Sequence, residues 1–401
     1  MTTEIAYPAL YLKRGEDERL RGGHLWVFSN EVDVRRSPLT GFEPGEPCVI
    51  VDSADKPLGV GYVNPNSLIC ARLLNRGVDH AIDRSLLVHK LKVALSLRER
   101  LYAEPYYRLA FGEADALPGL TLDRFGDVVV AQTTTAGMER LKDDIAAAVA
   151  KVIKPAALVW KNDAGIRALE GLPEYTDAGM NALPVSLLVR EGGLDFEIDP
   201  MGGQKTGWFY DQRANRDLLA PYVRDARVLD MFSYLGGWGL RAAAAGAKQA
   251  ICVDASAAAV AAITRNAQRN GLDGRVSAVR ADAFEYLKSQ RGARERYDVV
   301  ILDPPAFIKR KKDFAEGRLA YRRINEMAMQ ILARDGILIT CSCSYHMPRA
   351  ALLEAVQQGV RHLDRNMQVL AQLQQAPDHP VHPAIPETDY LKGFICRVLL
   401  S

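Results

Sequence analysis

Two cysteines and an aspartate stand where they could do chemistry together. Cys341 and Cys343 follow the apolar, β-branched run ILIT and are separated by one serine. Asp303 opens the stretch DPPAF, in which two consecutive prolines fix a rigid turn after the apolar run VVIL. A thiolate can attack C6 of a pyrimidine and so make C5 nucleophilic, whereas an exocyclic amine needs no such help. A thiol and an acid at neighbouring strand ends therefore predict covalent chemistry on a pyrimidine carbon.

Each of these residues also has a plainer structural interpretation. Cys341 lies inside the apolar run and is expected to be a buried packing cysteine, so Cys343, nearer the strand end, is the candidate nucleophile. Phe307 is predicted to stack on a flipped-out base that Asp303 hydrogen-bonds, and its alternative is a buried ring at an ordinary strand end. The C-x-C spacing has no second ligand pair, so no metal is predicted.

The elements that must position these residues alternate strictly between strand and helix. Strands are predicted at 228–232, 250–254, 276–282, 298–303 and 336–342, and helices at 238–245, 256–270, 283–290, 317–334 and 349–361. Such alternation predicts a doubly wound parallel sheet, in which ligands bind beyond the carboxyl ends of the strands.

The residues that follow those strands form a coherent series for a cofactor. Asp254 follows Asp230 at close to the sequence separation at which an acidic residue of such folds binds a pair of ribose hydroxyls. Three carboxylates would repel a diphosphate but suit a cationic nucleoside, which favours S-adenosylmethionine (SAM) over NAD. The glycine turn SYLGGWG also lacks the G-x-G-x-x-G spacing of NAD sites. The predicted cofactor residues are Asp230, Phe232, Gly236, Gly237, Asp254, Asp282 and Asp303, and a helix N-cap is the alternative for Asp282.

Basic residues cluster directly after the DPPAF turn. Residues 309–323 hold seven basic and two acidic side chains, which suits either phosphate contact or a solvated helix face. Their position beside the predicted cleft favours RNA, with Lys309 and Lys311 as expected contacts. A second basic group near the N-terminus is expected to contact RNA phosphates as well: Lys13, Arg14, Arg19 and Arg21.

The chain of 401 residues is long enough for several domains. The expected architecture is α/β, with a small N-terminal β-barrel at 1–78, a central α+β domain at 79–195 and a Rossmann-like domain at 196–401. Six cysteines without paired spacing and the lack of an 18-residue apolar stretch predict a cytoplasmic protein that does not enter a membrane. The sequence leaves monomer and homodimer both open.

Several stretches together resemble the bacterial 23S ribosomal RNA 5-methylcytosine methyltransferases of the large-subunit methyltransferase I type. They span most of the chain: LKRGEDERLRGGHLWVFSNEV, FGEADALPGLTLDRFGD, GQKTGWFYDQRANR, FSYLGG, DPPAF and SCS. The resemblance implies an N-terminal PUA domain, a central α/β domain and a C-terminal class I methyltransferase domain that uses SAM on 23S ribosomal RNA.

The same resemblance implies roles for single residues. Cys343, between two serines, matches the family nucleophile, and Asp303 matches the acid that steadies the cytosine ring. The DQR segment is implied to wall the cofactor pocket, with Arg213 toward the substrate. Leu235 departs from the family pattern, since a threonine usually precedes the paired glycines, and the extra Cys341 leaves the choice of thiol open.

Two alternatives to cytosine methylation remain. A related group shares the FSYxG and DPPxF motifs but methylates guanine nitrogen and carries asparagine around the late motif, whereas CSCS here favours carbon methylation. A non-catalytic RNA-binding protein is expected to have lost Asp303 or the cysteine, and this chain retains both.

Overall fold

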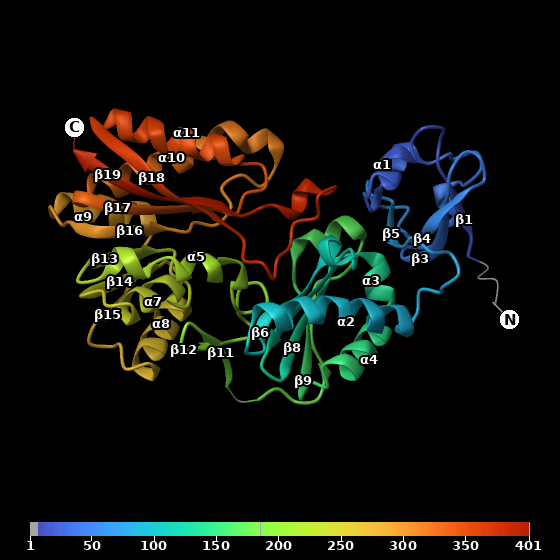
Figure 1. The fold of residues 1–401 in the computed structure, drawn as a ribbon, viewed down its shortest axis with the longest axis horizontal. Helices are drawn as coiled ribbons and strands as arrows, with labels where there is room; N and C mark the ends of the chain where they lie inside the picture. Colours follow the sequence, from blue (N-terminus) through green and yellow to red (C-terminus); the bar gives the residue numbers. More distant parts are fainter. Residues whose placement is uncertain (1–6, 185, 401) are drawn as a thin grey trace. The chain divides into compact units, whose positions relative to one another are not determined.

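The computed structural model describes residues 7–184 and 186–400, which form two compact units (Figure 1). The first unit consists of Met1–Leu187, Asp199–Tyr210 and Asp378–Thr388, and the second of Leu188–Ile198, Asp211–Pro377 and Asp389–Ser401. The chain therefore passes between the units more than once. The three-domain division made from the sequence stays a prediction.

The first unit contains two five-stranded sheets. The N-terminal sheet has the order β1-β3-β4-β5-β2 and packs around a core that includes Leu10, Val27 and Ile50. Its elements are β1 (Ala9–Tyr11), α1 (Glu18–Arg21), β2 (Trp26–Val27), β3 (Glu46–Val51), β4 (Pro57–Val63) and β5 (Ala71–Asn75). The short strands punctuated by Gly, Pro and Asn in the sequence account for this sheet.

The second sheet of this unit has the order β10-β9-β8-β7-β6. Its apolar face includes Leu122, Val129 and Trp160, and helices α2 and α4 supply further buried side chains to the same core. The elements are α2 (Arg84–Leu101), β6 (Tyr106–Phe111), β7 (Leu120–Phe125), β8 (Val128–Thr133), α3 (Ala136–Arg140), α4 (Lys142–Val152), β9 (Ala157–Asn162) and β10 (Tyr175–Met180). The helical patterns of the sequence at 80–104 and 138–153 account for α2 and the α3–α4 pair.

The second unit is built on a seven-stranded sheet of order β15-β14-β13-β16-β17-β19-β18. Strands β13 to β17 are parallel, and β19 and β18 add antiparallel pairs at one side. The strands are β13 (Arg227–Met231), β14 (Gln249–Asp254), β15 (Val276–Arg280), β16 (Tyr297–Leu302), β17 (Leu332–Ser342), β18 (Arg365–Gln374) and β19 (Lys392–Leu400), preceded by the hairpin β11 (Leu187–Glu191) and β12 (Leu194–Ile198). The predicted doubly wound sheet is confirmed.

Helices connect the parallel strands and cover the sheet (Figure 1). They are α7 (Gly237–Ala244), α8 (Ala257–Arg269), α9 (Ala283–Gly292), α10 (Phe314–Gln330) and α11 (Arg349–His362), while the short helices α5 (Arg213–Asp217) and α6 (Ala220–Val223) precede β13. Local signals fix their ends. The Ser256 hydroxyl accepts from the Ala259 amide at the start of α8, and Gly271 follows its end with a φ of 64°.

Two features of this sheet differ from the sequence prediction. Helix α10 ends at Gln330, not at 334. The prediction extended too far because Ile331 and Leu332 continue the apolar pattern of the helix, although Leu332 already belongs to β17. Strands β18 and β19 were not predicted, although β19 contributes Phe394, Cys396 and Val398 to the core.

Among the described residues, no helix is long and apolar enough to cross a membrane. That part of the chain also contains no group of three or more His, Cys, Asp or Glu side chains arranged to hold a metal ion.

Candidate active site

The order of the seven-stranded sheet reverses at β13, which lies between β14 and β16. In a sheet of this kind, the carboxyl ends of the two strands on either side of the reversal border a natural crevice for ligands. The turn after β13, Asp303 after β16 and the end of β17 all lie at this edge of the sheet. Most of the residues predicted from the sequence are thus placed at one edge.

Each carboxylate oxygen of Asp303 accepts a hydrogen bond from a side chain. Gln212 donates through Nε2 to Oδ1 at 2.9 Å, and Trp238 donates through Nε1 to Oδ2 at 3.0 Å. Asn215 donates in turn to Gln212 Oε1 at 2.7 Å, and the backbone amide of Gln374 donates to Asn215 Oδ1 at 3.2 Å. This series of hydrogen bonds fixes the orientation of the Gln212 and Asn215 amides, so preorganised donors hold the Asp303 carboxylate in one orientation.

The serines on either side of Cys343 anchor the end of β17. Ser342 donates to the Tyr321 hydroxyl at 2.8 Å, and that hydroxyl lies 3.0 Å from Ser344 Oγ. Both serines are buried, whereas Cys343 between them is half-buried. Its sulfur lies 3.9 Å from the carbonyl oxygen of Pro304, the residue after Asp303. The structure therefore brings the thiol and the DPP turn together, as predicted.

The other thiol of the motif has a different environment. Cys341 is fully buried, and this burial, followed by the negative charge of Asp303, raises the pKa of its thiol well above the usual value. A thiol in that setting is a poor nucleophile. All six cysteines lie in the described residues, and the five others are buried, so Cys343 is the thiol with access to solvent.

The turn after β13 has an unusual backbone. Phe232 and Tyr234 have φ values of 63° and 52°, and Gly236 follows with 84°. Bulky residues in the left-handed region are strained, and such strain gathers where the backbone must meet a ligand. A Cβ added at Gly239, one turn into α7, would lie 2.2 Å from the Cys252 sulfur, so this helix packs too closely on the sheet for any side chain there.

Asp254 sits at the end of β14 and accepts one backbone amide on each oxygen. Tyr234 donates to Oδ2 and Ser256 donates to Oδ1, both at 2.9 Å. Each oxygen retains a second lone pair, and the side chain is partly exposed. The carboxylate is therefore fixed in place and can still accept two hydroxyls.

Asp282 is the N-cap of α9, which confirms the structural alternative. Its Oδ1 accepts from the amides of Phe284 and Glu285 at 2.9 and 3.1 Å. Its other oxygen makes no hydrogen bond within the described residues, so a ligand contact by Asp282 stays a prediction.

Asp230 lies beneath the turn, inside β13. It is fully buried, and its Oδ2 accepts from the Gly239 amide at 3.0 Å, while Oδ1 has no hydrogen-bond partner among the described residues. Burial, followed by the charges of Asp303 and Asp254, raises the pKa of this carboxyl to about 7. Three acids thus lie near one another at this edge, which disfavours an anionic ligand and suits a cationic one.

The predicted substrate residues after the DPP turn lie beside an open hollow. Phe307 lines it together with Lys309, Arg310, Asp313 and Glu316. The Phe307 ring is partly buried and packs against Tyr321, with ring centroids 4.8 Å apart. Lys311 is exposed in the 3₁₀ turn η6 (Lys311–Asp313) that follows. This arrangement leaves an aromatic edge and several cations on one surface.

Arg213 takes part in a different cluster from the other candidates. Its Nε lies 3.5 Å from Glu191, which also forms ion pairs with Arg216 at 2.6 Å and Arg241 at 3.6 Å. Glu191 is buried, so these arginines bind α5 and α7 to the β11–β12 hairpin. A contact between Arg213 and the substrate stays a prediction.

Sequence reasoning missed the side chains that hold the predicted ones. Gln212 was noted only as part of the DQR segment, and Trp238 only as part of the glycine turn. Tyr321 was one unremarked residue of the basic run. Gln212 and Trp238 stand in the motifs GQKTGWFYDQR and SYLGGWG, but nothing in the spacing showed which acid they contact.

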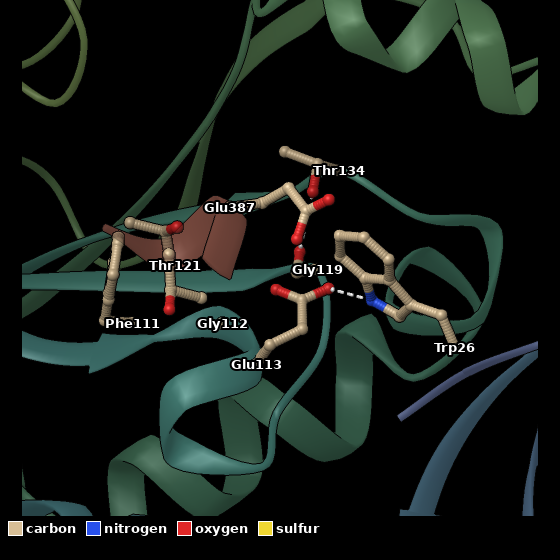
Figure 2. A pocket seen from close by; sticks show the side chains of 9 residues that line it. Trp26, Phe111, Gly112, Glu113, Gly119, Thr121, Thr134 and Glu387 are labelled. Atoms are coloured by element: carbon tan, nitrogen blue, oxygen red, sulfur yellow. Dashed lines mark hydrogen bonds between the residues drawn. The ribbon is translucent and has the colours of Figure 1, made fainter. Parts of the chain in front are cut away.

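The first unit has a hollow of its own, which none of the predicted site residues lines. Figure 2 shows Trp26 donating to Glu113, with Glu387, Thr134, Thr121 and other residues around the same space. The Trp26 Nε1 to Glu113 Oε1 distance is 2.9 Å. With two carboxylates on its wall, this hollow does not suit a phosphate group.

Comparison with known proteins agrees with this geometry. Residues 10–76 match the model of the PUA-like domain, and residues 180–392 match that of the S-adenosylmethionine-dependent methyltransferases. A Klebsiella pneumoniae protein named ribosomal RNA large subunit methyltransferase I is 36% identical over 99% of this chain and all of its own length. The protein of that name from Aliivibrio fischeri is 36% identical over 98% of this chain and 99% of its own.

The chain belongs to the ribosomal RNA large subunit methyltransferase I family. Its fold also matches a crystal structure of a methyltransferase complexed with SAH, with a TM-score of 0.82 and 22% identity over 97% of this chain and all of the other. The expected fold class is confirmed, with an N-terminal PUA-like domain and a C-terminal SAM-dependent methyltransferase domain.

The residues of this methyltransferase fit the cofactor that its family uses. SAM is a cation with a ribose and no phosphate, and the edge of the sheet offers three acids near a strained glycine turn. Asp254, which keeps two acceptor positions, is the residue that would hold the ribose hydroxyls. When bound, SAM supplies an electrophilic methyl group at this edge.

Proposed function

We propose that this enzyme forms 5-methylcytosine in 23S ribosomal RNA and that Cys343 is its nucleophile. The observation that carries the proposal is the position of the Cys343 sulfur, half-buried at the end of β17 and 3.9 Å from the carbonyl oxygen of Pro304. A nucleophilic thiol beside an oriented acid is what carbon methylation of a pyrimidine needs. The relatives' names support ribosomal RNA as the substrate.

In the proposed reaction, the Cys343 sulfur forms a bond to C6 of a flipped-out cytosine. The electrons of the C5–C6 double bond then become available at C5, which accepts the methyl group. Loss of the C5 proton to a base re-forms the double bond, and the bond between sulfur and C6 breaks. The thiolate is therefore returned at the end of each cycle, as covalent catalysis requires.

Asp303 is proposed to bind the edge of the base. In its protonated form it would transfer its proton to N3 as the sulfur attacks, so that the negative charge pushed onto the ring is neutralised, and it would take that proton back when the bond between sulfur and C6 breaks. Its other oxygen can accept from the exocyclic amine. Gln212 and Trp238 hold the acid for both contacts through their hydrogen bonds of 2.9 and 3.0 Å.

The surface beside the DPP turn is proposed to contact RNA. Several basic side chains of the run are paired within the protein, since Arg310 bonds Asp313 and Arg322 bonds Glu326. Lys309, Lys311 and Lys312 are exposed and form no ion pair within the described residues. These three lysines are therefore the best candidates for phosphate contacts, which position RNA without reading its sequence.

The N-terminal PUA-like domain is proposed to add further RNA contacts. Two of its predicted arginines already have partners in the protein, because Arg19 pairs with Glu31 at 2.6 Å and Arg21 with Asp52 at 2.6 Å. Both remain about two-fifths exposed, at 40% and 43%, so they can still approach a phosphate. Their share of the affinity is expected to be smaller than that of the exposed lysines.

Transfer of a labelled methyl group tests the proposed function. Purified enzyme and labelled SAM are incubated with 23S ribosomal RNA that lacks the modification, and the RNA is digested to nucleosides. Label on 5-methylcytosine supports the proposal, whereas label on a methylguanosine refutes it and favours the guanine-nitrogen alternative.

A further inference from the structure

Strand β19 brings a lysine to the cysteine motif from the far side of β17. The two strands are antiparallel, and Lys392 pairs in register with Ser342. Its ammonium donates to the carbonyl oxygen of Ser344 at 2.8 Å, and the residue is only 5% exposed. Strand pairing with Ser342 and the hydrogen bond to Ser344 thus hold a buried cation against the backbone next to Cys343. The sequence analysis did not identify this lysine.

Burying an ammonium group costs free energy unless it is hydrogen-bonded and paired with an opposite charge. Lys392 forms no ion pair with a carboxylate among the described residues. Burial lowers its pKa, the nearby charges of Asp389 and Cys343 oppose this, and the resulting pKa of about 8 leaves the side chain mostly protonated at neutral pH. A neutral donor could make the hydrogen bond to the Ser344 carbonyl equally well. That bond therefore does not explain why a positive charge is buried here, and a nearby negative charge would.

We propose that the Lys392 ammonium stabilises the thiolate form of Cys343, and that it is a positioning residue for the nucleophile. This inference rests on the proposed function for its purpose but not for its test. The thiol proton leaves to solvent, and the sulfur keeps its electron pair beside the cation. By holding the Ser344 carbonyl, Lys392 also keeps the turn that presents the sulfur to the base.

The other charged and titratable groups at this edge act in both directions. Asp303 precedes Pro304, whose carbonyl oxygen lies 3.9 Å from the sulfur, and its charge disfavours a thiolate. Asp389 acts on Lys392, whose pKa its charge raises, and Tyr321 on α10 is a neutral phenol whose pKa is raised, by burial first. Arg349 on α11 is a second cation near Lys392, but its guanidinium donates to the carbonyl of Leu373 at 2.8 Å. Lys392 is the cation bonded to the cysteine motif itself, which makes its charge the one that decides the balance.

Alkylation of Cys343 by iodoacetamide, followed across pH by peptide mass mapping, tests this inference in the full-length protein without RNA. The wild-type thiol is expected to titrate below the ordinary value of about 8.5. In Lys392→Met, its titration should move up by about one pH unit or more, so that the rate at pH 7 falls about tenfold. Lys392→Arg should restore the wild-type profile, and Cys343→Ala provides the background.

Lys392→Gln keeps an amide donor for the carbonyl and removes the charge, so it separates the two roles if the methionine variant does not fold. A profile unchanged in the folded neutral variants, or a wild-type thiol that titrates at 8.5 or above, would overturn the inference. If alkylation slows but methyl transfer by Lys392→Gln stays at the wild-type rate at pH 7, the role of Lys392 stands and Cys343 is not the nucleophile.

Discussion

The two donors that hold Asp303 offer a direct prediction about catalysis. Trp238→Phe removes the indole N–H but keeps an aromatic ring, and Gln212→Met removes the amide but keeps an unbranched chain. Each change deletes one hydrogen bond to the carboxylate that Asp303 becomes as it gives its proton to N3, and a hydrogen bond to a charged group is worth about 1.5 to 3 kcal/mol. If that orientation is needed in the transition state, kcat/KM should fall roughly 10- to 150-fold in each variant.

The assay is transfer of labelled methyl groups to 23S ribosomal RNA under kcat/KM conditions, with circular dichroism to confirm folding. Because both donors bind the same carboxylate, their effects should not be additive, and the double variant should lose less than the product of the single losses. Gln290→Met is a matched control, since Gln290 hydrogen-bonds Tyr297 rather than Asp303. Folded Trp238→Phe and Gln212→Met enzymes within about twofold of the wild type would refute the reasoning.

Three further predictions concern the cofactor, the buried acid and RNA. Asp254→Ala should raise the dissociation constant for SAM about tenfold or more by calorimetry, because charge-assisted hydrogen bonds to the ribose are lost, and unchanged affinity would discard that assignment. The pKa of Asp230 is raised from 3.8 to about 7 in the folded state, so wild-type stability should fall as pH rises from about 4 to 7, by roughly 4 kcal/mol from this group. The free energy of unfolding of Asp230→Asn in urea should lack that fall. Equal slopes of unfolding free energy against pH in the two proteins would show that the acid is not protonated when buried. Alanine at Lys311 and Lys312 should reduce the salt dependence of RNA affinity without changing the methylated base, and an unaltered slope would mean that these lysines only solvate the 3₁₀ turn.

The parallel sheet and its active edge could be predicted from the sequence because their signals are local. Alternating apolar strands and helices set the order of elements, and turn residues such as Gly271 fixed their ends. Since carboxyl ends of parallel strands meet at one edge, the positions of Asp303 and Cys343 followed without knowledge of side-chain contacts.

The contacts that prepare the site could not be predicted in this way. Trp238 and Gln212 lie 65 and 91 positions from Asp303 along the chain, and nothing in their local pattern names their partner. Lys392 depends on β19, a strand that returns antiparallel to β17 and was not expected. Asp282 shows the opposite limit, because its local N-cap role was equally consistent with the sequence and is what the structure contains.

The central claim is that Cys343 forms a covalent bond to C6 of cytosine, and trapping that bond tests it most directly. RNA containing 5-fluorocytosine carries a fluorine that cannot leave as a proton does, so the enzyme should remain attached after methyl transfer. Wild type and Cys341→Ala should give covalent protein–RNA complexes on a denaturing gel, and Cys343→Ala should give none while still binding SAM. A complex that depends on Cys341, or methylation of cytosine-containing RNA without any complex from the fluorinated substrate, would contradict the account.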